Sequence, residues 1–256
     1  MELRHLSAIV TGGASGLGEA CVRRIAEAGG KVAIVDLNQE RAEALIKEIG
    51  SKQIIFKKTD VTSAEEVENN VQEIVKTQGK VNGLINCAGI ATPGKVLGRK
   101  GVMELAAFEK VIKINLIGTF NMIRVVSDYM KENDVNDEGE RGVILNTASA
   151  AAFEGQIGQA AYSASKGGVA SMTLPLAREF SSLGIRVMTI APGLFETPMF
   201  DTLPQAAKDA LGSTVPFPNR LGNPAEYAKL MDSIMANPML NGEVIRLDGA
   251  LRMQPK

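Results

Sequence analysis

Short apolar runs rich in β-branched residues alternate with longer amphipathic stretches from one end of the chain to the other. Continuous apolar runs of this kind are typical of parallel strands that are buried on both faces of a sheet. The alternation predicts an α/β fold in which a doubly wound, mainly parallel sheet forms a single domain over residues 1–256. The seven predicted strands are 8–12, 32–36, 54–60, 83–89, 142–149, 186–193 and 243–249.

The stretch that follows the third of these strands shows the helical pattern most clearly. Ser63 offers an N-terminal cap with a glutamate three residues later, and Gly79 follows as a stop signal. Apolar residues recur along one face of the predicted helix, at Val67, Val71, Ile74 and Val75.

Three connections are longer than the loops typical of this architecture. Residues 90–103 carry several basic side chains, and residues 131–142 are acidic, which predicts a solvated surface excursion. Residues 194–223 are apolar and rich in proline. We find no linker, repeat or low-complexity segment that would divide the chain, so one domain is predicted.

Charge and hydropathy restrict the class of partner. The chain has 28 basic and 29 acidic residues, and its net charge of −1 argues against nucleic acid as the main partner. No uncharged apolar run reaches the roughly 18 residues needed to cross a bilayer, so we expect no membrane association.

Cysteine and histidine usage narrows the chemistry. Cys21 and Cys87 make neither a disulfide framework nor a metal site, so we expect no metal and a reducing compartment. A strand begins close to the chain start, with no secretory pattern and no room for a long presequence. A cytoplasmic location fits, or the mitochondrial matrix if the source is eukaryotic. The single histidine, His5, indicates that a general base must come from another residue type.

The first strand runs into TGGASGLG (11–18), just before an amphipathic helix. Glycines let a backbone turn tightly and approach a pyrophosphate, whose charge is favourable at a helix N-terminus. The turn predicts a dinucleotide site in a Rossmann-type domain. Its spacing is G-x-x-x-G-x-G, not G-x-G-x-x-G, and a purely structural turn is the alternative.

Asp36 ends the second strand, 18 residues after Gly18. An acid at about this distance holds the ribose hydroxyls of a dinucleotide. Its carboxylate would repel a 2′-phosphate, and Leu37 supplies no compensating cation, so NAD is favoured over NADP. The alternative is a helix cap at a strand–helix turn.

Two further strand ends belong to the same predicted crevice. Asp60 follows the third strand, where it serves either as an adenine contact or as a favourable charge at a helix N-terminus. NCAG (86–89) closes the fourth strand, and its Cys87 is expected to be a small buried residue and not a reactive thiol.

Residues 161–168 read AYSASKGG and place one of only three tyrosines four residues before a lysine. Helical spacing puts Tyr162 and Lys166 on one face, one turn apart. We expect the ammonium, together with the positive ring of an oxidised nicotinamide, to lower the pKa of Tyr162 from about 10. Tyr162 would then remove a proton from an alcohol while hydride leaves for the cofactor.

Two polar residues complete the predicted site. Ser149, at the end of the fifth strand, is placed to hydrogen-bond the same substrate oxygen. Asn115 is an unusually polar residue within the apolar helix KVIKINLIGTFNMI (110–123). Its amide is satisfied by backbone groups as an ordinary core amide, or organises a water chain to Lys166.

TGxxxGxG, N-x-A-G, Asn115, Ser149, YxxxK and PG (192–193) resemble, in this order, the short-chain dehydrogenase/reductase family. The resemblance implies a tetrad of Asn115, Ser149, Tyr162 and Lys166, with Lys166 on the nicotinamide ribose and Thr197 near the carboxamide. Cys87 departs from the second asparagine common in the family's NNAG motif. The cofactor contacts that we expect are Gly12, Ser15, Gly16, Leu17, Gly18, Asp36, Asp60, Val61, Cys87, Ala88, Gly89, Tyr162, Lys166, Pro192, Gly193, Leu194 and Thr197.

Longer stretches, among them RGVILNTASAAAFEGQIGQAAYSASKGG (141–168) and NGEVIRLDGALRMQP (241–255), are similar to the type II 3-hydroxyacyl-CoA dehydrogenase subgroup. This resemblance implies an NAD-dependent oxidoreductase of fatty acid metabolism that interconverts 3-hydroxyacyl-CoA and 3-oxoacyl-CoA, and a homotetramer. The family's substrate cap falls in 194–223. The substrate contacts that we expect are Ser149, Tyr162, Met199 and Phe200, with Leu203, Leu211 and Phe217 either in the cap or in the core.

Alternatives remain for the substrate and for the role. Lys95, Arg99 and Lys100 either meet CoA phosphates or form a solvated charge run. The alternatives to a 3-hydroxyacyl-CoA dehydrogenase are a dehydrogenase of steroid or other free secondary alcohols and a non-catalytic NAD-binding subunit. A 3-oxoacyl-carrier-protein reductase is disfavoured, because such enzymes generally use NADPH and Asp36 disfavours it.

Overall fold

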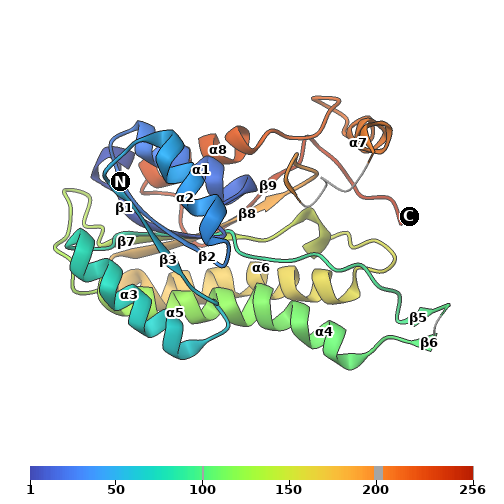
Figure 1. The fold of residues 1–256 in the computed structure, drawn as a ribbon, viewed down its shortest axis with the longest axis horizontal. Helices are drawn as coiled ribbons and strands as arrows, with labels where there is room; N and C mark the ends of the chain where they lie inside the picture. The colour runs from blue at the N-terminus through green and yellow to red at the C-terminus, as the bar shows by residue number, and fades with distance from the viewer. Residues whose placement is uncertain (100, 199–203, 256) are drawn as a thin grey trace.

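The computed structural model describes residues 1–99, 101–198 and 204–255. A sheet of seven strands, all paired in parallel, runs through the molecule in the order β3-β2-β1-β4-β7-β8-β9 (Figure 1). The chain builds outward from β1 in one direction and from β4 in the other. The strands are β1 (Ser7–Thr11), β2 (Lys31–Asp36), β3 (Ile54–Lys58), β4 (Gly83–Asn86), β7 (Gly142–Thr147), β8 (Ile185–Pro192) and β9 (Val244–Leu247).

Helices cover both faces of this sheet (Figure 1). One layer consists of α1 (Gly16–Glu27), α2 (Gln39–Ile49) and α8 (Pro224–Ala236). The other consists of α3 (Ala64–Gln78), α5 (Gly118–Met130) and α6 (Ala160–Phe180). The helix α4 (Leu105–Ile112) continues through a π-helical turn, η2 (Lys113–Ile117), into α5.

The two layers enclose two hydrophobic cores, one on each face of the sheet. Along β1, Ala8 and Val10 enter the core under α1 and α8, whereas Ile9 enters the core over α3 and α5. Because successive strand residues point to opposite faces, a strand buried on both sides reads as one continuous apolar run. The predicted doubly wound fold is confirmed, with strand ends within a few residues of those predicted.

The caps of α3 follow the sequence signals in part. The Ser63 hydroxyl accepts a 3.3 Å hydrogen bond from the Glu66 amide, and Gly79 ends the helix with φ +85°. The Glu66 carboxylate accepts from the Asp60 amide at 2.8 Å, so it ties the helix to the end of β3.

The long connections behave differently from one another. Residues 90–103 contain a two-stranded hairpin, β5 (Leu97–Gly98) with β6 (Gly101–Val102), which projects beyond α4 (Figure 1). The expectation of a solvated excursion over 131–142 is wrong for Glu140, whose side chain is 5% exposed. Its carboxylate accepts a 2.5 Å bond from the buried Arg186 of β8, and this partner offsets the cost of burying the charge.

No helix within the described residues is long and apolar enough to cross a membrane. Within the same ranges there is no group of three or more His, Cys, Asp or Glu side chains arranged to hold a metal ion.

Candidate active site

The glycine turn between β1 and α1 is packed so closely on neighbouring backbone that it requires glycine. Gly12 and Gly16 have φ values of +62° and +56°, which favour glycine because other residues are strained there. A β-carbon at Gly18 would lie 2.2 Å from the Gly12 carbonyl oxygen. The half-buried Ser15 and Leu17 flank Gly16, and Ser15 makes no side-chain cap bond to α1.

The ends of β1 and β4 meet beneath this turn. The Thr11 hydroxyl accepts hydrogen bonds from the amides of Cys87 and Ala88, each at 3.1 Å. A β-carbon at Gly12 would lie 2.9 Å from the Ala88 amide nitrogen. Because strand order reverses between β1 and β4, this is the crevice in which doubly wound sheets bind their ligands.

Asp36 lies at the carboxyl end of β2 and faces the glycine turn. One carboxylate oxygen accepts from the Ala14 amide at 3.1 Å, and the other accepts from the Asn38 amide at 3.0 Å. Its neighbour Leu37 is 60% exposed. Asp36 is therefore not the cap of α2, because Asn38 holds that position and accepts from the Arg41 amide.

Asp60 and Val61 follow β3. The Asp60 carboxylate accepts a 2.8 Å bond from the Thr62 amide, a local turn contact ahead of α3. Val61 is buried among the helices, and a β-carbon at Gly118 would lie 2.6 Å from its side chain. The structure shows this turn contact for Asp60, and the charge at the helix N-terminus and the adenine contact both stay predictions.

Gly89 connects the end of β4 to the predicted tetrad. A β-carbon there would lie 3.2 Å from Asn115 Oδ1 and 3.5 Å from Lys166 Nζ. Cys87 is half-buried against the core and accepts a 3.5 Å bond from the Thr147 hydroxyl. The small-residue interpretation of Cys87 agrees with this packing.

Asn115 sits in the π-helical turn η2 and is fully buried. Its Oδ1 accepts from the Ile90 amide at 2.8 Å, while its Nδ2 donates to the Ile90 carbonyl at 2.9 Å and to the Ser165 hydroxyl at 3.0 Å. The amide is thus satisfied as a core amide would be, and it fixes the loop after Gly89 beside α6.

Lys166 is buried on α6, one helical turn after Tyr162. Its Nζ donates a 2.7 Å hydrogen bond to the Thr147 carbonyl and lies 5.9 Å from the centre of the Tyr162 ring. Burial lowers the pKa of Lys166 to about 8, because a charged amine is costly away from water.

Ser149 lies two residues beyond β7 and caps a short 3₁₀ turn, η3 (Ala150–Ala152), by accepting from the Ala151 amide at 3.1 Å. Burial raises the pKa of Tyr162, and the Ser149 hydroxyl acts in the opposite direction. The expectation that Lys166 lowers this pKa is therefore wrong for the chain by itself. The ammonium is directed at Thr147, and the cost of burying a phenolate is the larger effect.

The end of β8 completes the crevice. Gly193 follows Pro192 and donates its amide to the Leu247 carbonyl at 2.9 Å. The excursion that starts here closes on itself, because the amide of Gly222 donates to the Leu194 carbonyl at 2.8 Å. Thr197 approaches the glycine turn, and a β-carbon at Gly16 would lie 3.4 Å from Thr197 Cβ.

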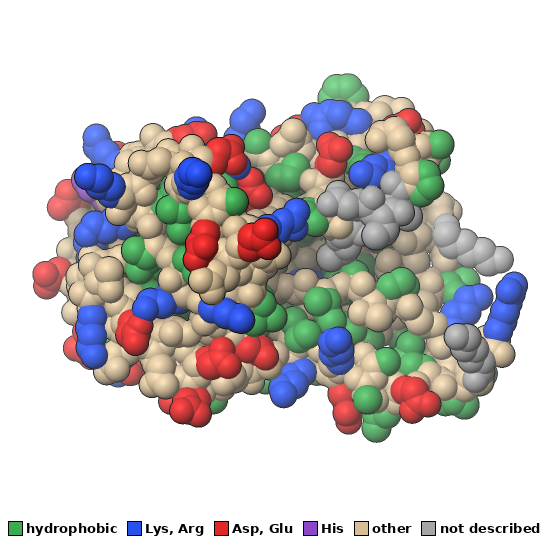
Figure 2. All heavy atoms as spheres, in the orientation of Figure 1, with side chains coloured by type: hydrophobic (Ala, Val, Ile, Leu, Met, Phe, Trp, Pro, Cys, Tyr) green, Lys and Arg blue, Asp and Glu red, His purple; other side chains and the backbone are tan. Residues whose placement is uncertain are grey.

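Two predicted substrate contacts, Met199 and Phe200, lie outside the described residues, as do Leu203 and Lys100. Within the described part of the excursion, Leu211 is half-buried in α7 (Gln205–Gly212) and Phe217 is 83% exposed. Phe217 is thus available to a ligand and is not a core residue. Figure 2 shows a hollow near the centre of the molecule, with hydrophobic side chains gathered below it.

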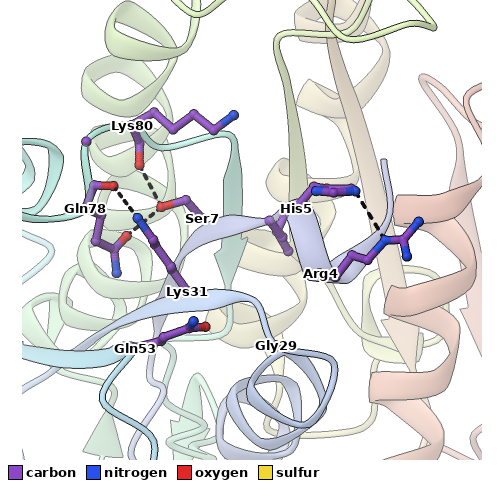
Figure 3. Close-up of a pocket in the computed structure, with 10 residues that line it drawn as sticks. Arg4, His5, Ser7, Gly29, Lys31, Gln53, Gln78 and Lys80 are labelled. Carbon is purple, nitrogen blue, oxygen red and sulfur yellow. Dashed lines mark hydrogen bonds between the residues drawn. The ribbon is translucent and has the colours of Figure 1, made fainter.

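A second hollow lies at the opposite, amino edge of the strands and has a volume of about 420 Å³ (Figure 3). Its polar groups are largely bonded to one another. Lys31 Nζ donates to the Gln78 carbonyl at 2.9 Å, and the Ser7 hydroxyl donates to Gln78 Oε1 at 2.8 Å. The predicted tetrad lies at the other end of the sheet, so this hollow is separate from the candidate active site.

The residues at the carboxyl edge fit a dinucleotide. The glycine turn leads into the N-terminus of α1, where a pyrophosphate is favourable, and a carboxylate stands at the end of β2. A serine, a tyrosine and a buried lysine face the same crevice. The family model for short chain dehydrogenases matches residues 7–208.

The chain belongs to the short-chain dehydrogenase family.

Individual relatives of this family match nearly the whole chain. A 3-hydroxyacyl-CoA dehydrogenase type-2 from Homo sapiens is 51% identical, over 99% of this chain and 98% of that protein. The crystal structure of 3-hydroxyacyl-CoA dehydrogenase type-2 from Mycobacterium avium superposes with a TM-score of 0.93 at 41% identity, covering 98% of this chain and 97% of that one. The crystal structure of a 3-ketoacyl-(acyl-carrier-protein) reductase from Brucella melitensis, complexed with NADH, superposes with a TM-score of 0.84 at 28% identity. The match covers 97% of this chain and 98% of that one.

Sequence reasoning missed two threonines of this dehydrogenase site. Thr11 joins the ends of β1 and β4, and the Thr147 carbonyl holds Lys166. The signal available for both was their position as the last residue of a strand whose carboxyl end borders the crevice.

Proposed function

We propose that this short-chain dehydrogenase is an NAD-dependent oxidoreductase that interconverts 3-hydroxyacyl-CoA and 3-oxoacyl-CoA. The observation that carries the proposal is the clustering of Ser149, Tyr162 and Lys166. The Lys166 amine lies 5.9 Å from the centre of the Tyr162 ring and close to Gly89 at the end of β4, and the Ser149 hydroxyl acts on Tyr162. The names and near-complete coverage of the relatives support the substrate class.

Tyr162 is proposed as the acid/base. In the oxidative direction its phenolate takes the proton of the 3-hydroxyl group, and in the reductive direction its phenol returns that proton. Ser149 donates a hydrogen bond to the substrate oxygen and favours the phenolate over the phenol. Lys166, held by the Thr147 carbonyl, places its ammonium 5.9 Å from the ring and binds the ribose hydroxyls of the cofactor.

When bound, the oxidised cofactor would accept a hydride and would carry a positively charged nicotinamide ring. NAD is proposed over NADP because Asp36 presents its carboxylate at the end of β2, beside an exposed leucine that offers no cation. A carboxylate in this position accepts hydrogen bonds from ribose hydroxyls and repels a 2′-phosphate.

The substrate's acyl chain is proposed to lie under residues 194–223, including Met199 and Phe200. The hydrogen bond from the Gly222 amide to the Leu194 carbonyl joins the two ends of this excursion, which supports the proposal, and an apolar cap would keep water away from hydride transfer. Exposed Lys95 and Arg99 at the hairpin are candidates for the CoA phosphates, although a solvated charge run explains their exposure equally well.

A homotetramer is proposed as the assembly. Ile117 and Phe120, one turn apart on the run from η2 into α5, are 52% and 47% exposed, and Leu174 on α6 is 44% exposed. Burial of such apolar surface against a second subunit is favourable.

A reducing compartment is also proposed, cytoplasm or mitochondrial matrix, because Cys21 and Cys87 are free thiols.

The deciding experiment follows NADH formation with 3-hydroxybutyryl-CoA, free 3-hydroxybutyrate and a steroid alcohol side by side, and repeats it with NADP. Preference for the thioester with NAD is expected. Equal or better use of the free alcohols would move the assignment to a dehydrogenase of free secondary alcohols.

The companion variant is Tyr162→Phe, which keeps the ring and removes the proton-transferring oxygen. It is expected to abolish turnover and to retain NADH binding. Retained turnover would refute the role of Tyr162, and NADH binding by the unmodified protein without turnover on any alcohol would favour a non-catalytic NAD-binding subunit.

A further inference from the structure

The segment between Ser149 and Tyr162 is held by residues from the far end of the chain. The Glu154 carboxylate accepts a two-pronged ion pair from Arg246 of β9, at 2.8 and 3.1 Å. The same carboxylate accepts from the Met253 amide at 3.2 Å and faces Arg252 Nε at 3.2 Å. One side chain thus gathers the C-terminal tail onto the segment that joins the two predicted catalytic hydroxyls.

Backbone and ring contacts repeat the attachment. The Ile157 amide donates to the Pro255 carbonyl at 3.0 Å, and the Arg246 guanidinium lies 5.4 Å from the centre of the Phe153 ring. The side chains of Arg246 and Glu154 are 21% and 26% exposed, so the pair is partly shielded from water. A bidentate, partly buried pair holds geometry better than a single surface contact.

Arg246 carries the attachment onward to the end of β8. Its Nε donates to the buried Asp248 carboxylate at 2.7 Å. Asp248 packs against Gly193, where a β-carbon would lie 2.9 Å from Asp248 Cα. The chain of contacts from Glu154 through Arg246 and Asp248 therefore reaches the proline–glycine end of β8 at the cofactor crevice.

On the other side of Glu154, the contacts extend to the predicted base, Tyr162. A β-carbon at Gly155 would lie 2.1 Å from Ser163 Oγ, so the residue after Glu154 packs directly on the residue after Tyr162. The Gly158 carbonyl accepts from the Gly94 amide at 2.8 Å, which also joins the segment to the loop before the hairpin. Movement of the segment would therefore move α6 at Tyr162.

We propose that Glu154 is a positioning residue, whose ion pair with Arg246 fixes the segment from Ser149 to Tyr162 against the Gly193 end of β8. The inference rests on the proposed role of Tyr162 as the acid/base. Glu154 itself does not touch the reacting atoms. It acts by holding two hydroxyls in register with each other and with the crevice, and catalysis is sensitive to misplacement of this kind.

The test is Glu154→Gln, which keeps the shape of the side chain and removes its charge. We expect kcat with 3-hydroxybutyryl-CoA to fall on the order of 10- to 100-fold, because the reacting groups lose their alignment. The NADH dissociation constant should change much less than kcat, because the glycine turn and Asp36 are untouched. The midpoint of the kcat–pH profile should move upward, because Ser149 no longer favours the Tyr162 phenolate as strongly.

The matched control is Glu48→Gln. Glu48 also makes a bidentate pair with an arginine, Arg23, at 2.9 Å on both prongs, but it lies on α2, remote from Tyr162. We expect this variant to leave kcat and the pH profile unchanged. Arg246→Lys, which keeps the charge and loses the planar fork, should reproduce the kcat loss and the upward shift.

Wild-type kcat and pH profile in Glu154→Gln, with only a lower melting temperature, would show that the pair supports folding alone and would overturn the proposal. If Glu154→Gln does not fold, wild-type kcat in Arg246→Lys overturns it instead. Failure of the proposed function is distinguishable, because it appears as retained turnover in Tyr162→Phe.

Discussion

The side-chain amine of Lys166 is bonded to the backbone carbonyl of Thr147, 2.7 Å away at the end of β7. Lys166 is thus a buried ammonium group that donates a hydrogen bond to this carbonyl. Such a charge is costly, and its cost appears as a pKa of about 8 in place of 10.5. Stability therefore disfavours this lysine, and its proposed role at the cofactor ribose would account for its presence.

We predict that Lys166→Met loses turnover but gains stability relative to the unmodified protein at pH 7. Because the folded-state pKa of Lys166 is lowered, the unfolded chain binds more protons between pH 8 and 10.5. The free energy of unfolding of the unmodified protein, relative to the variant, should therefore rise by about 3 kcal/mol across that interval. Urea denaturation of both proteins at pH 7, 8, 9 and 10.5 measures the difference.

The control is Lys76→Met, on the exposed side of α3. The difference in free energy of unfolding between Lys76→Met and the unmodified protein should not rise in this way between pH 8 and 10.5. A flat difference for Lys166→Met as well would mean that the Thr147 carbonyl and its surroundings fully compensate the buried charge.

Cofactor choice provides a second prediction. Asp36→Asn keeps a side-chain oxygen for the glycine-turn or Asn38 amide and removes the negative charge. We expect the preference for NAD over NADP to fall on the order of 10- to 100-fold, because the repulsion of a 2′-phosphate is lost. The ratio of kcat/KM values for the two cofactors measures it.

Asp60→Asn is the matched control, because Asp60 also lies just after a strand at the same sheet edge, two residues beyond β3, and accepts from a nearby amide. An unchanged ratio would support its local turn role. A fall in NAD affinity for this variant would favour the adenine contact instead.

The assembly gives a third prediction. Phe120→Asp places a charge on the exposed apolar face that Phe120 shares with Ile117. If subunits pair through this face, burial of the new carboxylate is unfavourable and the tetramer should split into smaller species. Light scattering on eluted protein gives the mass.

Val135→Asp, at a similarly exposed position in the 131–142 connection, should leave the mass unchanged. An intact tetramer in Phe120→Asp would place the interface elsewhere on the molecule.

Local patterns were sufficient to predict the seven strands and the order of the site residues. A parallel strand buried on both faces can be recognised from a run of consecutive apolar residues. A polar residue at the end of such a strand is predicted to lie at the crevice. Asp36 illustrates this, since it ends β2 and its carboxylate accepts from the Ala14 amide of the glycine turn.

Contacts between distant parts of the chain could not be predicted in this way. Glu140 reads as one more acid in a polar stretch, yet it pairs with Arg186, 46 positions away in sequence. Glu154 and Arg246 are 92 positions apart. The predicted direction of the Tyr162 pKa shift was wrong for a related reason. The burial of Tyr162 and the direction of the Lys166 amine depend on the packing of whole elements.

The last prediction concerns Asn115, whose side chain satisfies the Ile90 amide and carbonyl. Asn82 does the same at the opposite edge of the sheet, where its Oδ1 accepts from the Ser7 amide at 2.7 Å and its Nδ2 donates to the His5 carbonyl at 3.1 Å. Both are buried, at 0% and 5% exposure. Replacing either by alanine leaves buried backbone groups unpaired, so each variant should lose about 1–3 kcal/mol of stability.

Activity should separate the two variants. Asn115 holds the loop that starts at Gly89, next to Lys166, so Asn115→Ala should lower kcat on the order of tenfold or more even when fully folded. Asn82→Ala should keep its kcat, because its loop lies at the amino edge of the sheet, far from Tyr162. Equal kcat values for the two variants, measured well below their melting temperatures, would mean that Asn115 is a core amide and nothing more.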